Sequence, residues 1–131
     1  LRGWRVEAEF LEAVFERLEQ VAWPTPVYYP NVNAPLPTAP HYRAAVLPVD
    51  GQNLATCGTT RRTWLFQVTA AVRSGVGQIK LAQMIDFISA EFLVNTEVGQ
   101  FRQVDVGNTA PVIVLDGWAF LPVTYKFEVI I

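Results

Sequence analysis

Apolar and polar residues alternate along the stretch from Arg61 to Arg73. Alternation places every second side chain on the same face of an extended chain, so this spacing predicts a long β-strand with one buried face. That face carries Trp64, Phe66, Val68, Ala70 and Val72. The other face carries mostly polar residues, namely Thr63, Gln67, Thr69, Ala71 and Arg73.

An amphipathic helix is predicted directly after this strand. Beyond Gly75 and Gly77, apolar residues recur at three- and four-residue steps, which is the spacing of one helix face. The stripe consists of Leu81, Ile85, Ile88 and Phe92, widened by Ala82, Met84 and Leu93. We expect Gly75 and Gly77 to form a structural turn, because glycine tolerates positive φ. A phosphate-binding loop is the weaker hypothesis, because the third glycine of a dinucleotide fingerprint and the Gly-Lys-Ser/Thr of a Walker loop are missing here.

The stretch Arg2–Ala22 predicts another amphipathic helix, with an acidic outer side. Its apolar stripe consists of Phe10, Val14 and Leu18, with Leu11, Phe15 and Ala22 beside it. Its opposite face carries Glu9, Glu12, Glu16 and Glu19. Clustered carboxylates can bind a metal or act in acid–base catalysis, but carboxylates spread over helical turns without a histidine are more typical of a solvated face.

Prolines dominate the segment between Trp23 and His41 and exclude both a helix and a central strand there. We expect an ordered arm, held to the domain or offered to a neighbour by its aromatic residues, in preference to a mobile linker. The candidate partner contacts on this arm are Trp23, Pro24, Tyr28, Tyr29 and Asn31.

A hairpin is predicted from a strand over Tyr42–Val49, a polar loop over Asp50–Thr60 and the long strand that follows. This loop is longer than a tight turn needs, so we expect it to project toward a partner. The candidate contacts are Asn53 and Leu54 in the loop, with Arg61 and Arg62 beside it.

The C-terminal part predicts short strands over Gln103–Val106 and Val112–Leu115, then a turn and a last long strand. Asp116-Gly117 is a strong turn signal, with Gly117 as its structural glycine. The face of the last strand that begins with Trp118 is too apolar for a fully wetted surface. Pro122 on that face predicts a sheet edge or a bulge.

Together these elements predict one α+β domain over residues 1–131. It comprises an N-terminal helix (1–22), a proline and aromatic arm (23–41), and a sheet with the second helix (42–131). We expect a mostly antiparallel sheet of about four to five strands, with both helices packed on one side.

Composition adds an expectation of assembly. Of 131 residues, 51% are hydrophobic and only 17% are charged, against about 25% in an average soluble domain. Surplus apolar surface on a small domain predicts a partner or an oligomer. A net charge of −2 with scattered basic residues argues against nucleic-acid binding. No apolar run is long enough for a membrane span, so we expect a soluble, intracellular product.

Candidate chemistry is sparse. Cys57 is the only cysteine and His41 the only histidine, so no disulfide framework or metal cluster is expected within one chain. Trp64, Phe66, Tyr125 and Phe127 can line a ligand pocket, although such aromatic residues more often form the core. The pattern contains no catalytic triad, carboxylate pair or cofactor motif, so we expect a protein that is not an enzyme and binds no cofactor.

The order and spacing of these segments resemble the tail-terminator, or tail-completion, proteins of long-tailed bacteriophages. The likeness covers nearly the whole chain. It lies in the N-terminal helix and in TPVYYPNVNAP (25–35), YRAAVLP (42–48), QVTAAVRSGVGQIKLAQMIDFISAEF (67–92) and DGWAFLPVTYKFEV (116–129).

This resemblance implies a structural virion protein that closes the tail tube as a hexameric ring, ends tube polymerisation and forms the surface for head–tail joining. The implied partners are further copies of the chain, the tail tube protein and the head–tail connector or neck proteins. The implied location is the head-proximal end of the tail, after assembly in the host cytoplasm. The alternatives are another neck or tail component, such as a connector or tube protein, and a small-ligand-binding or enzymatic domain.

Overall fold

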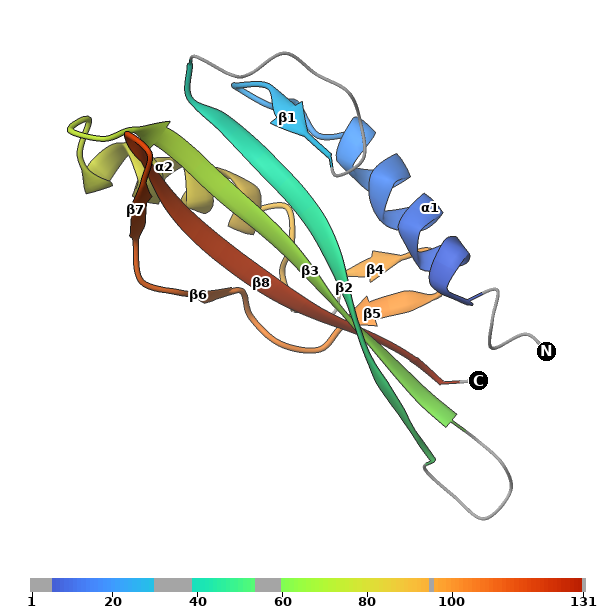
Figure 1. The fold of residues 1–131 in the computed structure, drawn as a ribbon. Helices are drawn as coiled ribbons and strands as arrows, with labels where there is room; N and C mark the ends of the chain where they lie inside the picture. Colours follow the sequence, from blue (N-terminus) through green and yellow to red (C-terminus); the bar gives the residue numbers. More distant parts are fainter. Residues whose placement is uncertain (1–5, 30–38, 54–59, 95, 131) are drawn as a thin grey trace.

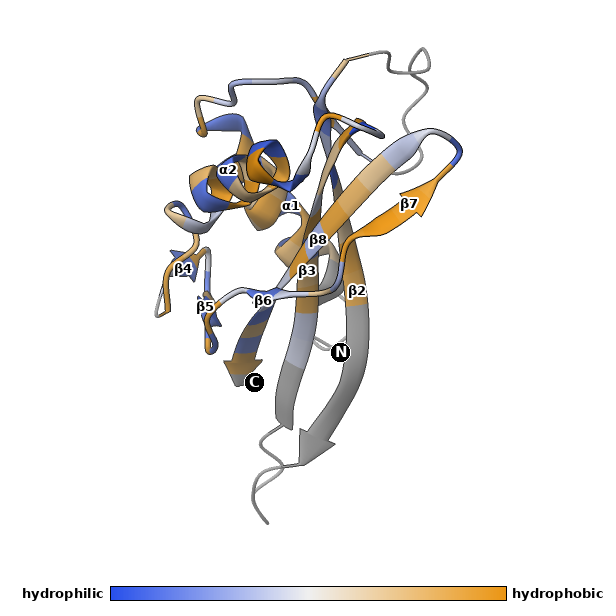
Figure 2. Cartoon of the chain, turned by 90° about the vertical axis from the view of Figure 1, so that its left-hand side faces the viewer, coloured by the Kyte–Doolittle hydropathy of each residue, from blue (hydrophilic) through white to orange (hydrophobic). Residues whose placement is uncertain are grey.

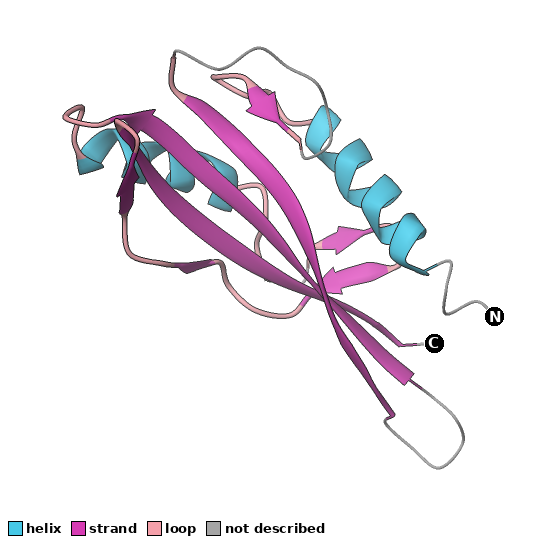
Figure 3. Ribbon diagram, in the orientation of Figure 1, coloured by secondary structure: helices cyan, strands magenta, loops and turns pink. Residues whose placement is uncertain are grey.

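The computed structural model describes residues 6–29, 39–53, 60–94 and 96–130, and its architecture is α+β (Figures 1 and 3). Within these residues two helices accompany one mostly antiparallel sheet of eight strands. In chain order the elements are α1 (Val6–Glu19), β1 (Val27–Tyr28), β2 (His41–Asn53), β3 (Thr60–Arg73), α2 (Gln78–Ser89), β4 (Glu97–Val98), β5 (Phe101–Gln103), β6 (Asn108–Thr109), β7 (Ile113–Leu115) and β8 (Trp118–Ile130).

Three long twisted strands, β2, β3 and β8, form the body of the sheet (Figure 1). The strand order is β1-β2-β3-β8-β5-β4, and β6 and β7 also pair with β8. Phe66 of β3 lies opposite Val46 of β2 and Tyr125 of β8, so the buried faces of all three strands are in register. Only the β1–β2 pair is parallel among the described strands.

The number of strands exceeds the predicted four to five. The additional strands are short, and β1, β4 and β6 contain two residues each. A strand of this length shows no alternation that a sequence pattern can reveal. Its pairing depends on the neighbouring long strand. The local sequence of the short strand therefore does not specify this pairing.

The connection predicted over Asp50–Thr60 is wrong at both ends. β2 continues to Asn53 and β3 begins at Thr60, so strand pairing occupies much of the expected loop. The register between the two strands shifts between Val49 and Gln52. The Asp-Gly pair at 50–51 therefore lies in a bulge of the ladder instead of opening the loop. Residues 54–59 lie outside the described part.

Both helices bury the same face of the sheet. Phe10 of α1 lies against Trp64, Phe101 and Phe127, with ring-centroid distances of 5.4, 4.8 and 5.5 Å. The buried residues of α2 are Leu81, Met84, Ile85 and Ile88. They cover the predicted inner face of β3, where Trp64, Phe66, Val68, Ala70 and Val72 are all 2% exposed or less.

The predicted helical stripes are correct at their centres and wrong at their margins. Phe10, Val14 and Leu18 of α1 are fully buried. Ala22 and Leu93 are exposed, because α1 ends at Glu19 and α2 ends at Ser89. Ala82 is also exposed, since it faces outward from α2.

Two buried tyrosines fix α2 to the sheet. The hydroxyl of Tyr42 in β2 donates to the Met84 carbonyl at 2.9 Å. The hydroxyl of Tyr125 in β8 lies 2.9 Å from the Ser89 hydroxyl. Burial, followed by the charge of Tyr125, raises the pKa of Tyr42 to about 12, so its phenol stays a hydrogen-bond donor at neutral pH. These bonds satisfy polar groups that burial would otherwise leave unpaired.

Pro122 lies in an interior strand whose pairing with β3 is continuous, so it marks neither the edge nor the bulge that were the predicted alternatives. It faces Thr69 of β3, and its carbonyl accepts from the Ala110 amide at 3.2 Å on the opposite side. The nitrogen and carbonyl of one strand residue point to the same side, so the missing N–H of Pro122 faces away from β3. On that side β6 ends at Thr109 and β7 begins at Ile113, which leaves a break in the ladder.

A two-residue turn joins β7 to β8, as the Asp116-Gly117 signal predicts. Both residues have positive φ, at 53° for Asp116 and 80° for Gly117, which is the pattern of a type I′ hairpin. Gly75 and Gly77, between β3 and α2, have φ of 95° and 101°. A residue with a side chain would be strained at any of these glycines.

Gly107 gives a direct test of this packing. A Cβ at this position would lie 2.6 Å from a ring carbon of Tyr125 and 2.9 Å from a methyl of Val123. Tyr125 is fully buried, so its ring cannot move away cheaply. We predict that Gly107→Ala lowers the free energy of unfolding by about 1–3 kcal/mol in urea denaturation. The control Ala110→Ser, at an exposed position directly after β6, is expected to be neutral. Equal stability of wild type and Gly107→Ala would contradict this packing.

Candidate functional site

The face of the sheet opposite the helices is the candidate functional surface, and we call it the helix-free face. Figure 2 shows both helices on one side of the long strands and apolar β7 on the other side. Alternation along the strands places a second set of side chains on this surface. The set comprises Arg43, Ala45 and Leu47 of β2, Leu65, Gln67, Thr69 and Arg73 of β3, Ile113 and Leu115 of β7, and Trp118, Phe120, Pro122, Thr124 and Lys126 of β8.

An apolar recess occupies one end of the helix-free face. Its volume is about 370 Å³, and it is lined by Arg43, Gln67, Thr69, Ile113, Leu115, Phe120 and Pro122. Ile113 and Leu115 are 53% and 59% exposed, so β7 presents aliphatic side chains to solvent. Clustered exposed apolar residues of this kind mark interaction surfaces.

Two arginines lie over aromatic rings beside this recess. The Arg43 guanidinium lies 5.0 Å from the Phe120 ring centroid, and the Arg73 guanidinium lies 4.6 Å from that of Trp118. Both arginines are exposed at their outer side. A guanidinium held over a ring keeps a fixed position and most of its N–H donors, so it can bind a carboxylate with little loss of freedom.

His41 supports this cluster from below. Its ring lies 5.3 Å from the Tyr28 ring and 5.0 Å from the Trp118 ring, and it is 1% exposed. The Arg43 Nε donates to His41 Nε2 at 3.2 Å, so the proton of a neutral imidazole lies on Nδ1, which is 3.0 Å from the Ala39 carbonyl. Burial lowers the pKa of His41 and the charge of Arg43 lowers it further, while the bond to Ala39 opposes them.

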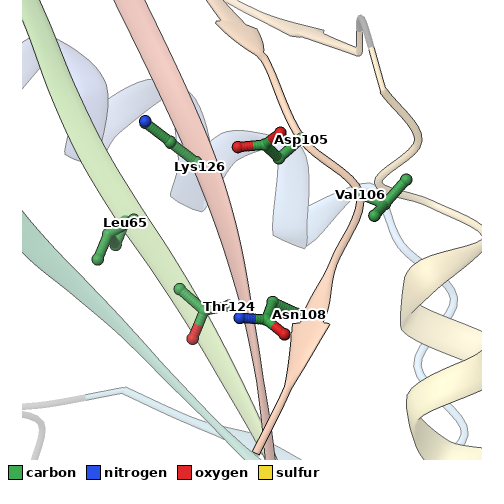
Figure 4. A pocket seen from close by; sticks show the side chains of 6 residues that line it. All are labelled: Leu65, Asp105, Val106, Asn108, Thr124 and Lys126. Atoms are coloured by element: carbon green, nitrogen blue, oxygen red, sulfur yellow. The ribbon is translucent and has the colours of Figure 1, made fainter.

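A more polar recess lies further along the helix-free face (Figure 4). It also has a volume of about 370 Å³ and is lined by Leu65, Asp105, Val106, Asn108, Thr124 and Lys126. The buried Gln103 holds one wall, because its amide donates to the carbonyls of Phe92 and Asp105 at 2.8 Å each. This recess combines hydrogen-bonding groups with the exposed Val106, as the rim of a protein interface does.

The predicted arm packs on its own domain over the residues that the structure describes. The indole of Trp23 donates to the Leu18 carbonyl at 2.9 Å and lies 4.8 Å from the Tyr42 ring. The Tyr29 ring lies 5.2 Å from that of Phe15, and burial, followed by the charge of Glu19, raises the pKa of Tyr29.

The other predicted contact residues have more varied positions. Pro24 is exposed, and Tyr28 packs edge-on against His41. Asn31 and Leu54 lie outside the described residues. Three more predicted contacts have their backbones in the described strands, namely Asn53 in β2 and Arg61 and Arg62 in β3. Their side chains lie outside the described part.

The aromatic residues considered for a ligand pocket form the core instead. Trp64, Phe66, Tyr125 and Phe127 are each 2% exposed or less. Among the described residues, no group of three or more His, Cys, Asp or Glu lies close enough to hold a metal ion. Neither helix in the described part of the chain has the length and hydrophobicity of a transmembrane segment.

Sequence reasoning missed the arginine–aromatic cluster. Its members come from three strands and meet only through register, which places His41 opposite Ala71 and Arg73 opposite Trp118. The one sequence signal that pointed to this surface was the apolar outer face of the last strand. That signal indicated an uncovered surface but did not identify Arg43 as part of it.

Comparisons with known proteins show the fold but not the function. No protein-family model matches this sequence, and no curated protein matches it. One solved protein structure, described without any function, is similar to this chain at a TM-score of 0.68 and 20% sequence identity. The likeness covers 95% of this chain and 92% of that one.

The burial of neutral His41 predicts a loss of stability in weak acid. The pKa of His41 in the unfolded chain is near its ordinary value of 6.5, and folding lowers it. As the pH falls, His41 therefore takes up a proton in the unfolded state before it does so in the folded state. The free energy of unfolding decreases as the pH falls below the pKa of the unfolded state. The urea concentration at the unfolding midpoint should decrease as the pH is lowered from about 7 to about 5.5. His41→Gln should show a smaller fall, and an equal fall in both proteins would contradict this prediction.

Proposed function

We propose that this chain is a non-catalytic virion subunit that assembles as a ring and closes the tail tube of a long-tailed bacteriophage. In this role it ends tube polymerisation and forms the surface for head–tail joining. Its partners are other copies of itself, the tube protein and the connector or neck proteins. Its place is the head-proximal end of the tail, reached after assembly in the host cytoplasm.

One observation supports an assembly role most strongly. The helix-free face exposes aliphatic side chains of β7 and Leu47 of β2, which is 42% exposed. A domain of 131 residues of which 17% are charged has few charged side chains with which to cover such a face. Burial against another protein stabilises an apolar surface by about 25 cal/mol per Å² removed from water.

The tail-terminator assignment itself rests on the sequence resemblance over residues 25–35, 42–48, 67–92 and 116–129. The domain also suits a ring subunit in its form. The helices and the helix-free face lie on opposite sides, so one copy can contact the next through two different surfaces (Figure 2). Contacts between unlike surfaces generate closed rings when the rotation between copies closes.

The position of His41 supports a role without catalysis. Both ring nitrogens are engaged within the fold, with Ala39 and Arg43. Its low exposure, 1%, also keeps it from a substrate in solution. General acid–base work requires a group within hydrogen-bond reach of the reacting atoms.

The test is the mass of the purified chain by native mass spectrometry, with negative-stain electron microscopy of the same sample. We predict a ring that contains six copies of the chain, as the tail-terminator hypothesis requires. We also predict that Leu115→Asp shifts the chain to monomers, because it places a charge on the exposed aliphatic surface of β7. The matched control is Ile79→Asp, at a position 77% exposed on α2, which should assemble normally.

Two outcomes contradict the proposed function. A monomer at all concentrations would exclude a self-assembling ring, and open polymers would indicate a tube subunit. A separate result, loss of assembly in Ile79→Asp with retention in Leu115→Asp, would place the interface on α2 and not on the helix-free face.

A further inference from the structure

The outward side of α1 carries unpaired negative charge. Glu12, Glu16 and Glu19 are exposed and lie at steps of four and three residues, which places them on one side of the helix. None of them has an ion-pair partner among the described residues. The nearby Arg17 instead pairs with Glu91 at 3.3 Å, within the same domain. This side of the molecule is therefore acidic.

The helix-free face carries the complementary charge. Arg43 and Arg73 are exposed there, and neither pairs with a carboxylate among the described residues. The rings of Phe120 and Trp118 below them are consecutive outward residues of β8, so the two guanidiniums lie over neighbouring rings. Lys126 is exposed on the same face too, but it shares its recess with the exposed Asp105, so the two arginines carry the net positive charge. This arrangement is a fixed basic surface next to an apolar recess.

The acidic and the basic surfaces of one chain cannot meet. α1 lies on the helical side of the sheet, and both arginines lie on the other side. The same two surfaces can meet when one copy follows another in the same orientation. Opposite charges placed in this way favour encounter and fix the register between partners. The half-buried Leu11 next to the glutamates can then reach toward the apolar recess.

We propose that the occupant of the helix-free face is α1 of a second copy of this chain. In this contact Glu12 and Glu16 of one copy pair with Arg43 and Arg73 of the next, and the neighbouring apolar residues exclude water around them. The inference rests on the proposed ring function and adds to it the two surfaces that join successive subunits. Each copy offers α1 to one neighbour and its helix-free face to the other.

The test uses two charge-reversed full-length variants. The first, Arg43→Glu with Arg73→Glu, makes the helix-free face acidic. The second, Glu12→Lys with Glu16→Lys, makes α1 basic. In either variant alone the two surfaces carry the same sign, so association should weaken at least about a hundredfold. Single reversals on α2, Lys80→Glu and Asp86→Lys, are the controls and should assemble as wild type does.

Mixing the two variants is the decisive step. The acidic α1 of the first then meets the unchanged basic face of the second, and the basic α1 of the second meets the acidic face of the first. An equimolar mixture should regain assembly in native mass spectrometry, with the variants alternating around an even-numbered ring. Six copies satisfy this condition. Two variants that are each impaired regain assembly together only if the reversed residues face one another.

The outcomes separate this inference from the proposed function. If wild type does not assemble, the proposed function fails. If wild type assembles and both variants assemble equally well, or if the mixture fails to recover, the pairing of α1 with the helix-free face is overturned while a ring remains. Circular dichroism and thermal unfolding check that each variant is folded. If a reversal unfolds the chain, Arg43→Gln with Arg73→Gln replaces it, and wild-type assembly should then weaken with added NaCl while that of the neutral variant should not.

Discussion

The structure depends on the one-sided burial of a sheet that carries some apolar side chains on both faces. One face carries Trp64 and Phe66 of β3 with Tyr125 and Phe127 of β8, and Phe10 of α1 and Phe92 after α2 complete the core there. Burying a large aromatic side chain stabilises a small domain by several kcal/mol, so this face fixes where the helices pack. Both available helices are used there. On the opposite face, only arginine side chains, short strands or a partner can then shield the apolar residues from water.

The same packing makes the uncovered face rigid. Tyr42 and Tyr125 hold α2 by hydrogen bonds from within the core, and three long strands are paired over most of their length. On the outer side, His41 supports Trp118, and Arg43 is held by both His41 and Phe120. A partner would therefore meet a surface whose groups are already ordered. Preorganisation of this kind reduces the entropy lost on association.

Much of the fold was predictable because its long elements have strong periodicity. The inner face of β3 and the stripe Phe10, Val14 and Leu18 followed directly from residue spacing. Short strands, the bulge near Gly51 and the place of Pro122 were not predictable, because each depends on what the neighbouring strand does. The candidate surface was predictable only in part. Sequence indicated that one side of β8 was too apolar, but strand register was needed to bring Arg43 beside it.

In the assembled protein, the helix-free face should be covered by a neighbouring copy. Hydroxyl-radical footprinting of side chains, measured from dilute to concentrated protein, tests it most directly. We expect Ile113 and Leu115 to become protected at the concentrations where the mass shows an oligomer, while exposed Ile79 on α2 stays reactive. Unchanged reactivity of Ile113 and Leu115 in the assembled protein would show that this face stays open to solvent.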